Sequence, residues 1–552
     1  MMNRSIVSGI IALVFSFCLN AQNDNFLWPL ESKYVPSGNY GELRPNHFHA
    51  GLDFGTHGRY NAPVYATMKG YVSRIKVSDG GYGRAIYLTH PNGKVTLYAH
   101  LNKYMPKVEK FILEEQLKKK SFEVEIYPEP GTFTVNAGDV IAYSGNSGSS
   151  TAPHLHYEIR DEKTEVPLNP ALYYKIDDKI APVVNYMAIY NLSDTTSPRV
   201  ITYYKLIKSG NDYKLKDDSI TVNNSIIAFG VSGFDKMFAN GGVNNIYSVE
   251  MYYDDIFFYK HVLDNVPFND TRYVNEFSEI YEKKKFQRLF IPTLYPEGMY
   301  KRVGNKGRIF LMDGKYHQIK MKFLDESGNE CSLSFYIKAT KKNYFEKPII
   351  NGDAFADCRQ DFMYGRKGLQ IFIPANTLYN STPVIFENTL NTSGKLLILP
   401  FSANLRSTAI VGFEIPKKFK PFKHSLVFKS NESLFLPIVK GDSVFYSVKS
   451  FGAFLLDVDT IAPKIQCEVN GSKLKSKYLK RITFKIYDNL SGLDNYNLYL
   501  NGEWVLASYD TKSRRLSYDF DSSIKKGKNE FKVVCTDYCK NKSEEIIYYT
   551  KY

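Results

Sequence analysis

The chain has 552 residues, which at about 150 residues per domain predicts three or four folding units. Its composition, 43% hydrophobic and 23% charged, is that of a globular protein and excludes extensive disorder. The net charge of +14 is compatible with an anionic partner such as a wall polymer, a membrane or a nucleic acid, and equally with a lysine-rich surface that binds nothing. The 43 tyrosines and 37 phenylalanines favour strands over helices.

The first residues have the features of a secretory signal peptide. Arg4 supplies a positive start, an apolar run extends from Ile6 to Cys18, and Ala21 offers a small residue at the cleavage point. We therefore expect residues 1–21 to be removed and the protein to be exported, either to the periplasm or cell envelope or beyond it. No later stretch approaches the roughly 18 apolar residues of a membrane-spanning helix, so we expect no transmembrane span.

The histidines indicate which part of the chain performs chemistry. Seven of the ten lie within residues 47–156, and the rest of the chain carries only three. This part contains short apolar runs separated by Gly- and Pro-rich turns, the pattern of antiparallel β structure. The exception is the segment from Lys107 to Lys120, whose apolar residues among charges predict one short helix.

Beyond about residue 175, two segments carry the same sequence marks. Ile180-Ala181-Pro182 recurs as Ile461-Ala462-Pro463, and Ser232-Gly233-Phe234-Asp235 recurs as Ser491-Gly492-Leu493-Asp494. These marks predict two copies of one β-sandwich module, the first with a longer insertion. In pattern the module resembles immunoglobulin-like modules of exported bacterial proteins, although it lacks the Cys…Trp…Cys spacing of true immunoglobulin domains.

The fold class that we expect is mainly β, with an N-terminal antiparallel β domain followed by two or three β-sandwich domains. The expected boundaries are 1–21 for the signal peptide, 22–175 for the histidine-rich domain, 176–345 for the first sandwich with its insertion, 346–456 for a strand-rich domain, and 457–552 for the C-terminal sandwich.

Three clusters in the N-terminal domain could build a metal site. They are His49-Ala50-Gly51-Leu52-Asp53, Tyr98-Ala99-His100-Leu101 and His154-Leu155-His156. A hydrolytic zinc site needs three protein ligands from His, Asp or Glu and an open position for water. Together the clusters indicate metal binding or catalysis far more strongly than any one of them alone.

The spacing within the clusters constrains the backbone. On a straight strand, residues four apart lie roughly 13 Å from each other, so His49 and Asp53 can share a metal only if the chain bends, and Gly51 and Gly55 are placed to allow that. Alternate residues on one strand face lie about 6.6 Å apart, so one histidine of His-x-His can bind metal while the other faces the substrate.

Residues 27–170 resemble the LytM/lysostaphin-type zinc metalloendopeptidases, which cut peptide cross-links in bacterial cell walls. The family's marks are H-x-x-x-D, a histidine in a Y-x-H-L setting, and a terminal H-x-H, and all three are present here. The resemblance implies that His49, Asp53 and His156 bind Zn²⁺. It implies that His100 and His154 are the catalytic pair, which orient or deprotonate the attacking water and stabilise the oxyanion.

The resemblance leaves several points open. The expected activity is hydrolysis of peptidoglycan peptide stems, and the alternatives are a catalytically silent wall-binding or hydrolase-activating scaffold of the same fold, or a secreted protease of other proteins. An insertion at about residues 108–131 is expected to border the substrate groove, or else to be a solvated decoration. The C-terminal modules could bind an envelope protein or the wall, and we expect no nucleic-acid partner.

Overall fold

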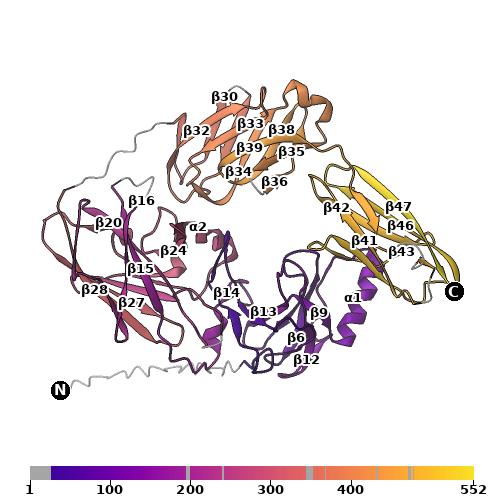
Figure 1. The fold of residues 1–552 in the computed structure, drawn as a ribbon, viewed down its shortest axis with the longest axis horizontal. Helices are drawn as coiled ribbons and strands as arrows, with labels where there is room; N and C mark the ends of the chain where they lie inside the picture. Colours follow the sequence, from indigo (N-terminus) through magenta and orange to yellow (C-terminus); the bar gives the residue numbers. More distant parts are fainter. Residues whose placement is uncertain are drawn as a thin grey trace, which may run out of the picture.

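The computed structural model describes residues 26–552 except 194–198, 239–240, 343–351, 367, 431–432, 470–473 and 476–477. The structure is mainly β, as the sequence predicted. Four β-rich units follow one another around a ring, and the last returns to the first (Figure 1). The predicted signal peptide lies outside the described residues. Among the helices of the described part, none is both long and apolar enough to cross a membrane.

The N-terminal unit is built from two sheets and a small hairpin. The large sheet has the order β1 (Pro36–Gly38), β4 (Leu52–Gly55), β13 (His154–Asp161), β8 (Lys94–Ala99), β7 (Arg84–Thr89), β6 (Gly70–Val77) and β10 (Val124–Ile126), with β14 (Pro167–Leu168) on β13 and β11 (Thr134–Val135) on β6. The second sheet consists of β5 (Pro63–Tyr65), β12 (Val140–Ser144) and β9 (Leu101–Tyr104), and the hairpin of β2 (Leu43–Arg44) and β3 (His47–Phe48).

Strand β13 separates the core of this unit from its polar face. Leu155, Tyr157 and Ile159 are fully buried in the hydrophobic core that the two sheets share. Because successive side chains of a strand point to opposite faces, the alternate residues project from the other face. These are His154, His156, Glu158 and Arg160. The apolar alternation of one strand thus fixes which residues can build a site.

The predicted helix is present as α1 (Pro106–Lys119). Pro106 stands in its first turn, where the missing N–H costs nothing, and Lys120 ends it in a left-handed conformation with φ of 48°. Val108, Ile112 and Gln116 are its buried residues, and their spacing of four places them on one face. The helix packs against β9 and β10.

Three β-sandwiches follow, each formed by two sheets that contribute to one core. One sheet of the first sandwich has the order β16 (Arg199–Lys205), β15 (Val183–Asn191), β20 (Ile226–Phe234), β24 (Lys284–Arg288) and β23 (Ser278–Tyr281), with β26 (Ile309–Phe310) on β20. The other sheet has the order β17 (Ile207–Ser209), β18 (Asp212–Lys214), β28 (Glu330–Ala339), β27 (His317–Leu324), β21 (Ser248–Tyr253), β22 (Ile256–Val262) and β25 (Tyr300–Val303), with β19 (Ser219–Val222) on β28. The one further α-helix described, α2 (Val274–Phe277), lies in the long insertion.

The second and third sandwiches are simpler. The second has β29 (Ala354–Ala356), β32 (Thr382–Thr389), β33 (Lys395–Leu399), β39 (Gly452–Val458), β35 (Leu426–Ser430) and β36 (Ser433–Phe435) facing β30 (Phe362–Arg366), β31 (Leu369–Ile373), β34 (Asn404–Glu414), β38 (Ser443–Ser450) and β37 (Ile438–Lys440). The third has β40 (Lys464–Cys467), β41 (Arg481–Tyr487), β45 (Arg515–Asp519) and β44 (Ser508–Asp510) facing β43 (Glu503–Val505), β42 (Leu493–Leu500), β46 (Gly527–Asp537) and β47 (Lys542–Lys551). Each sandwich thus has a core of its own, and the residue boundaries between the units stay a prediction.

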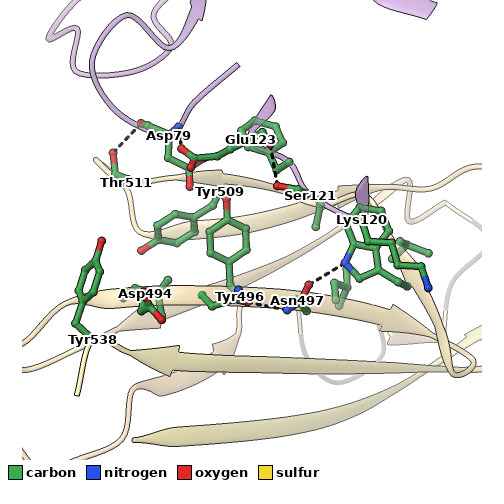
Figure 2. Close-up of a pocket in the computed structure, with 17 residues that line it drawn as sticks. Asp79, Lys120, Ser121, Glu123, Asp494, Tyr496, Asn497, Tyr509, Thr511 and Tyr538 are labelled. Atoms are coloured by element: carbon green, nitrogen blue, oxygen red, sulfur yellow. Dashed lines mark hydrogen bonds between the residues drawn. The ribbon is translucent and has the colours of Figure 1, made fainter. Parts of the chain in front are cut away.

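The third sandwich closes the ring by contacting the N-terminal unit. The hydroxyl of Tyr496 donates a hydrogen bond of 2.5 Å to the Asp79 carboxylate, and Thr511 donates one of 3.3 Å to the Asp79 carbonyl. Between the two units lies a cavity of about 280 Å³ that Asp79 lines from one side and Tyr496, Tyr509 and Tyr538 from the other (Figure 2). The residues after α1, from Lys120 to Glu123, form part of its wall. The inserted segment therefore borders the contact with the third sandwich, and its expected position beside the substrate groove stays a prediction.

We expect ring closure to weaken as pH rises. Burial against the third sandwich, helped by the nearby Glu123 and Asp510 carboxylates and opposed by the Tyr496 hydroxyl, raises the pKa of Asp79 to about 7. An undocked Asp79 would return towards its ordinary pKa of 3.8. The docked state therefore binds the proton more tightly, and docking loses strength as pH rises towards and through about 7.

The measurement is the distance between fluorophores on the N-terminal unit and the third sandwich at about pH 5.5 and about pH 8.5, values that lie on either side of the shifted pKa. The separation should be larger at the higher pH in the wild type and independent of pH in Asp79→Asn. A pH response that survives in the variant would contradict this account.

Candidate metal centre

The backbone brings the first and third histidine clusters together by pairing β4 with β13. In this antiparallel register His156 lies directly opposite Asp53. His49 precedes β4, and the chain between His49 and Asp53 passes so close to β13 that a Cβ on Gly51 would meet the Tyr157 carbonyl oxygen at 2.2 Å. Only glycine permits that approach. The bend that the spacing required is therefore made at Gly51.

Three ligand atoms converge where these segments meet. His49 Nε2 lies 3.1 Å from Asp53 Oδ1 and 3.0 Å from His156 Nδ1, and His156 Nδ1 lies 2.8 Å from Asp53 Oδ1. Ligands of a tetrahedral zinc ion, at metal distances of about 2.0–2.1 Å, are about 3.3–3.4 Å apart. All three side chains are buried. The donor set and the near-equal spacing fit zinc.

Each candidate ligand is held by a neighbour on its far side. His49 Nδ1 lies 2.7 Å from the Asn39 carbonyl oxygen, so Nε2 is the nitrogen free for a metal. His156 Nε2 lies 2.8 Å from Glu158 Oε1, which leaves Nδ1 for the metal. A carboxylate or carbonyl behind a histidine in this way fixes its tautomer and raises its basicity as a ligand.

Two arginines complete this supporting layer. Arg160 Nε donates to Glu158 Oε2 at 2.7 Å, and this buries a paired charge beside the centre. Arg44, from the β2–β3 hairpin, donates to Asp53 Oδ2 at 2.5 Å, so Oδ1 is the oxygen left for a metal. Glu158 and Arg160 are not among the residues predicted from the motifs, although their period of two after His154 and His156 places all four on one strand face. No local pattern marked Arg44.

The electrostatics of the cluster favour a cation. Burial raises the pKa of Asp53, but interactions with His49, His154 and His156 outweigh it and hold this pKa well below its ordinary value. Burial lowers the pKa of His156, but hydrogen bonds to Asp53 and Glu158 more than offset it and raise this pKa to about 9. A metal at Nδ1 must therefore displace a proton from His156, which makes its binding weaker at low pH.

His100 and His154 lie beside the three converging residues. His100 follows β8 in a left-handed conformation, with φ of 59°, and its ring centroid is 4.7 Å from that of His154 and 5.9 Å from that of His156. Its Nδ1 lies 2.8 Å from the Ser147 carbonyl oxygen. His154 Nδ1 lies 2.8 Å from the Ala152 carbonyl oxygen. Both rings are thus anchored at Nδ1. This leaves Nε2 of His100 for a substrate or water, while His154 Nε2 lies 3.4 Å from Asp53 Oδ1.

The candidate site is exposed near His47 and is contacted by the third sandwich near His154. His47, which precedes His49 by two residues, is exposed, and its Nδ1 lies 2.9 Å from the Pro45 carbonyl oxygen. On the opposite side, Lys512 of the third sandwich reaches the loop that leads to His154, where its Nζ donates to the carbonyl oxygens of Asn146 and Ser150. A cavity of about 570 Å³ lies between this loop and the sandwich.

We expect Glu158→Gln to weaken zinc binding by about 10–100-fold, because a neutral amide no longer supports the basicity of His156. The measurement is competition for zinc with a chromogenic chelator. Glu162→Gln is the matched control, since Glu162 is exposed just beyond the same strand. Equal zinc affinity in the two variants would show that Glu158 does not support the ligand.

Known proteins are similar to the N-terminal part of this chain. The pattern described as Peptidase family M23 matches residues 47–117 and 129–170. DD-carboxypeptidase/endopeptidase Mpg of Neisseria meningitidis is 33% identical over 122 residues, which are 22% of this chain and 22% of that protein. Lysostaphin of Staphylococcus simulans is 27% identical over 196 residues, 35% of this chain and 33% of its own. The chain thus matches about a fifth of the length of the Neisseria relative.

Two solved structures each cover about a quarter of this chain. The catalytic domain of the M23 protein EnpA from Enterococcus faecalis is 25% identical, covers 25% of this chain and 91% of that chain, and has a TM-score of 0.19. The catalytic domain of lysostaphin from Staphylococcus simulans is 26% identical, and the match covers 25% of this chain and 90% of that domain, with a TM-score of 0.19. The matched family pattern spans all five residues that the motifs singled out. Residues 47–117 and 129–170 of this chain therefore match peptidase family M23, the LytM/lysostaphin family that its motifs resemble.

Proposed function

We propose that this protein is an exported zinc metalloendopeptidase that hydrolyses peptide cross-links of bacterial peptidoglycan. The observation that carries the proposal is the convergence of His49 Nε2, Asp53 Oδ1 and His156 Nδ1, with two further histidines anchored beside them. A catalytic domain within residues 22–175, followed by sandwiches at 176–345, 346–456 and 457–552, is the organisation that we propose. All five residues of the motif set are in place, which favours an active enzyme over a silent scaffold.

The proposed chemistry assigns a separate task to each group. Zinc held by the three ligands would lower the pKa of a water molecule towards about 7 and polarise the scissile carbonyl. Burial, and then the neighbouring His156 and His154, lower the pKa of His100 to about 3, so His100 is neutral at neutral pH and able to accept a proton at Nε2. His154, held through Nδ1, would in its imidazolium form donate a hydrogen bond from Nε2 to the oxygen on which negative charge develops.

The substrate is proposed from the relatives and from charge. The Neisseria relative is named a DD-carboxypeptidase/endopeptidase, and lysostaphin is an antimicrobial peptidase by description. A net charge of +14 would favour association with an anionic wall. Export rests on the sequence of residues 1–21. The sandwiches would hold the catalytic domain in the ring and offer surfaces to an envelope partner.

We expect the full-length zinc-loaded protein to convert cross-linked peptide dimers of peptidoglycan into monomers, as separated by mass spectrometry. His100→Ala and His154→Ala should each lower the rate by about a hundredfold to ten-thousandfold, because each removes one proton-transfer or charge-stabilising group. His424→Ala is the matched control, since His424 is exposed in the second sandwich.

Removal of zinc by a chelator should abolish cleavage, and added zinc should restore it. Cleavage that persists in both histidine variants would contradict the assigned roles. Zinc binding without any cleavage of peptidoglycan, while unrelated peptides are cut, would contradict the proposed substrate and favour a secreted protease of other proteins.

A further inference from the structure

Two clusters of three aspartates occupy corresponding places in the first and third sandwiches. Within each cluster, ligand oxygens of the three side chains all lie within 4.8 Å of one another. The clusters are Asp178, Asp235 and Asp325 in the first sandwich and Asp459, Asp488 and Asp537 in the third. Neither cluster belongs to the candidate zinc centre.

The backbone shows that the clusters are copies of one arrangement. Asp178 and Asp459 stand two residues before the repeated Ile-Ala-Pro, and each accepts a hydrogen bond from the N–H two residues on. Val183 pairs with Phe234 and Lys464 with Tyr487, so the strand that pairs with the first strand ends directly before Asp235 or Asp488.

This pairing corrects the residue correspondence expected from the repeated Ser-Gly motif. That motif aligned Asp235 with Asp494, whereas the structure places Asp488 in the position of Asp235. Asp494 instead pairs with Lys540 at 2.7 Å, outside the cluster. The shift arises because β20 includes the Ser-Gly pair, whereas β41 ends before it.

An asparagine in the following hairpin completes each copy with the same hydrogen bonds. Asn329 donates its backbone N–H and its amide to the two oxygens of Asp325, at 2.8 and 2.7 Å, and its amide to the Asp178 carbonyl oxygen at 3.1 Å. Asn541 makes the same three contacts with Asp537 and Asp459, at 2.8, 2.8 and 3.1 Å. Two segments of differing sequence thus keep one acidic geometry.

The carboxylates of these clusters lack a cationic partner within the described residues. Asp235 is only 1% exposed, and neither of its carboxylate oxygens has a hydrogen-bond partner of normal geometry. The Oδ1 atom of Asp488 is likewise buried and unpartnered. None of the six aspartates forms an ion pair with a described lysine or arginine. Burial, together with Glu326, Asp325 and Asp178, and opposed only weakly by the Lys236 N–H, raises the pKa of Asp235 to about 8.

We propose that each cluster binds a hard divalent cation, Ca²⁺, so that the chain carries two structural calcium sites besides the zinc centre. The donors are all oxygens, which suit calcium rather than zinc. Oxygens on opposite sides of a calcium ion at about 2.4 Å are about 4.8 Å apart, so one ion can reach all three carboxylates. A buried, unpaired Asp235 is costly alone and becomes favourable when it binds a cation.

The sites lie where a cation can fix the orientation of the sandwiches. Asp178 and Asp459 belong to the segments that enter the first and third sandwiches, whereas their partners belong to the sandwiches themselves. In the first copy, Glu326 directly follows Asp325 and accepts a hydrogen bond of 2.8 Å from the Asn39 amide. The carbonyl oxygen of Asn39 contacts His49. A cation there would stiffen the support of a candidate zinc ligand.

The test is calcium binding to the full-length protein, which is freed of calcium with EGTA, reloaded with one equivalent of zinc and then dialysed against radiolabelled calcium. The wild type should bind two calcium ions per chain, Asp235→Asn and Asp488→Asn one each, and the double variant none. Asp494→Asn is the matched control and should bind two, since Asp494 resembles Asp235 in motif but lies outside the cluster.

Thermal unfolding supplies a second readout. Saturating calcium should raise the unfolding temperature of the wild type by a few degrees, on the order of 3 °C, and should leave that of the double variant unchanged. If Asp235→Asn does not fold, Asp178→Asn makes the same comparison in that cluster. A wild type that binds no calcium at millimolar concentration, or Asp235→Asn and Asp488→Asn variants that still bind two ions, would overturn the proposal.

Discussion

The candidate centre depends on one backbone constraint, the antiparallel pairing of β4 with β13 at a separation that only glycine at position 51 allows. This register sets His156 opposite Asp53, and the close passage at Gly51 brings His49 back over the same pair. Because β13 buries every second residue in the core, its other face must carry the polar side chains. The hydrophobic core therefore positions the ligands, and a slip of one residue would exchange the two faces.

The other units of the ring also bear on this centre. The β2–β3 hairpin places Arg44 on Asp53 and packs Leu43 and Phe48 into an apolar cluster with residues of the first sandwich. Asn39 contacts His49 through its carbonyl oxygen and Glu326 of that sandwich through its amide. From the opposite side Lys512 holds the loop before His154. The sandwiches thus support the edges of the N-terminal unit, which a freely tethered accessory module would not do.

Much of this could be predicted from the sequence. Apolar alternation predicted the β class, the charged segment after Lys107 predicted α1, and the spacing of His49 from Asp53 required a bend, because all three depend on local backbone geometry. What could not be predicted depends on distant contacts. No local pattern marks Asp79 as the partner of Tyr496, and the Ser-Gly motif favoured Asp494 over Asp488 because strand ends are set by pairing. Glu158 could have been found from its period of two after His156.

We propose that His49 Nε2, Asp53 Oδ1 and His156 Nδ1 together hold one zinc ion. The most direct measurement is a crystal structure of the zinc-loaded protein with anomalous diffraction collected on both sides of the zinc absorption edge. We predict one zinc peak within about 2.2 Å of each of these atoms, with Glu158 still bonded to His156 Nε2. Zinc bound through His156 Nε2 would contradict the account. So would zinc bound elsewhere in the protein while Asp53 still contacts Arg44, His49 and His156 as it does here.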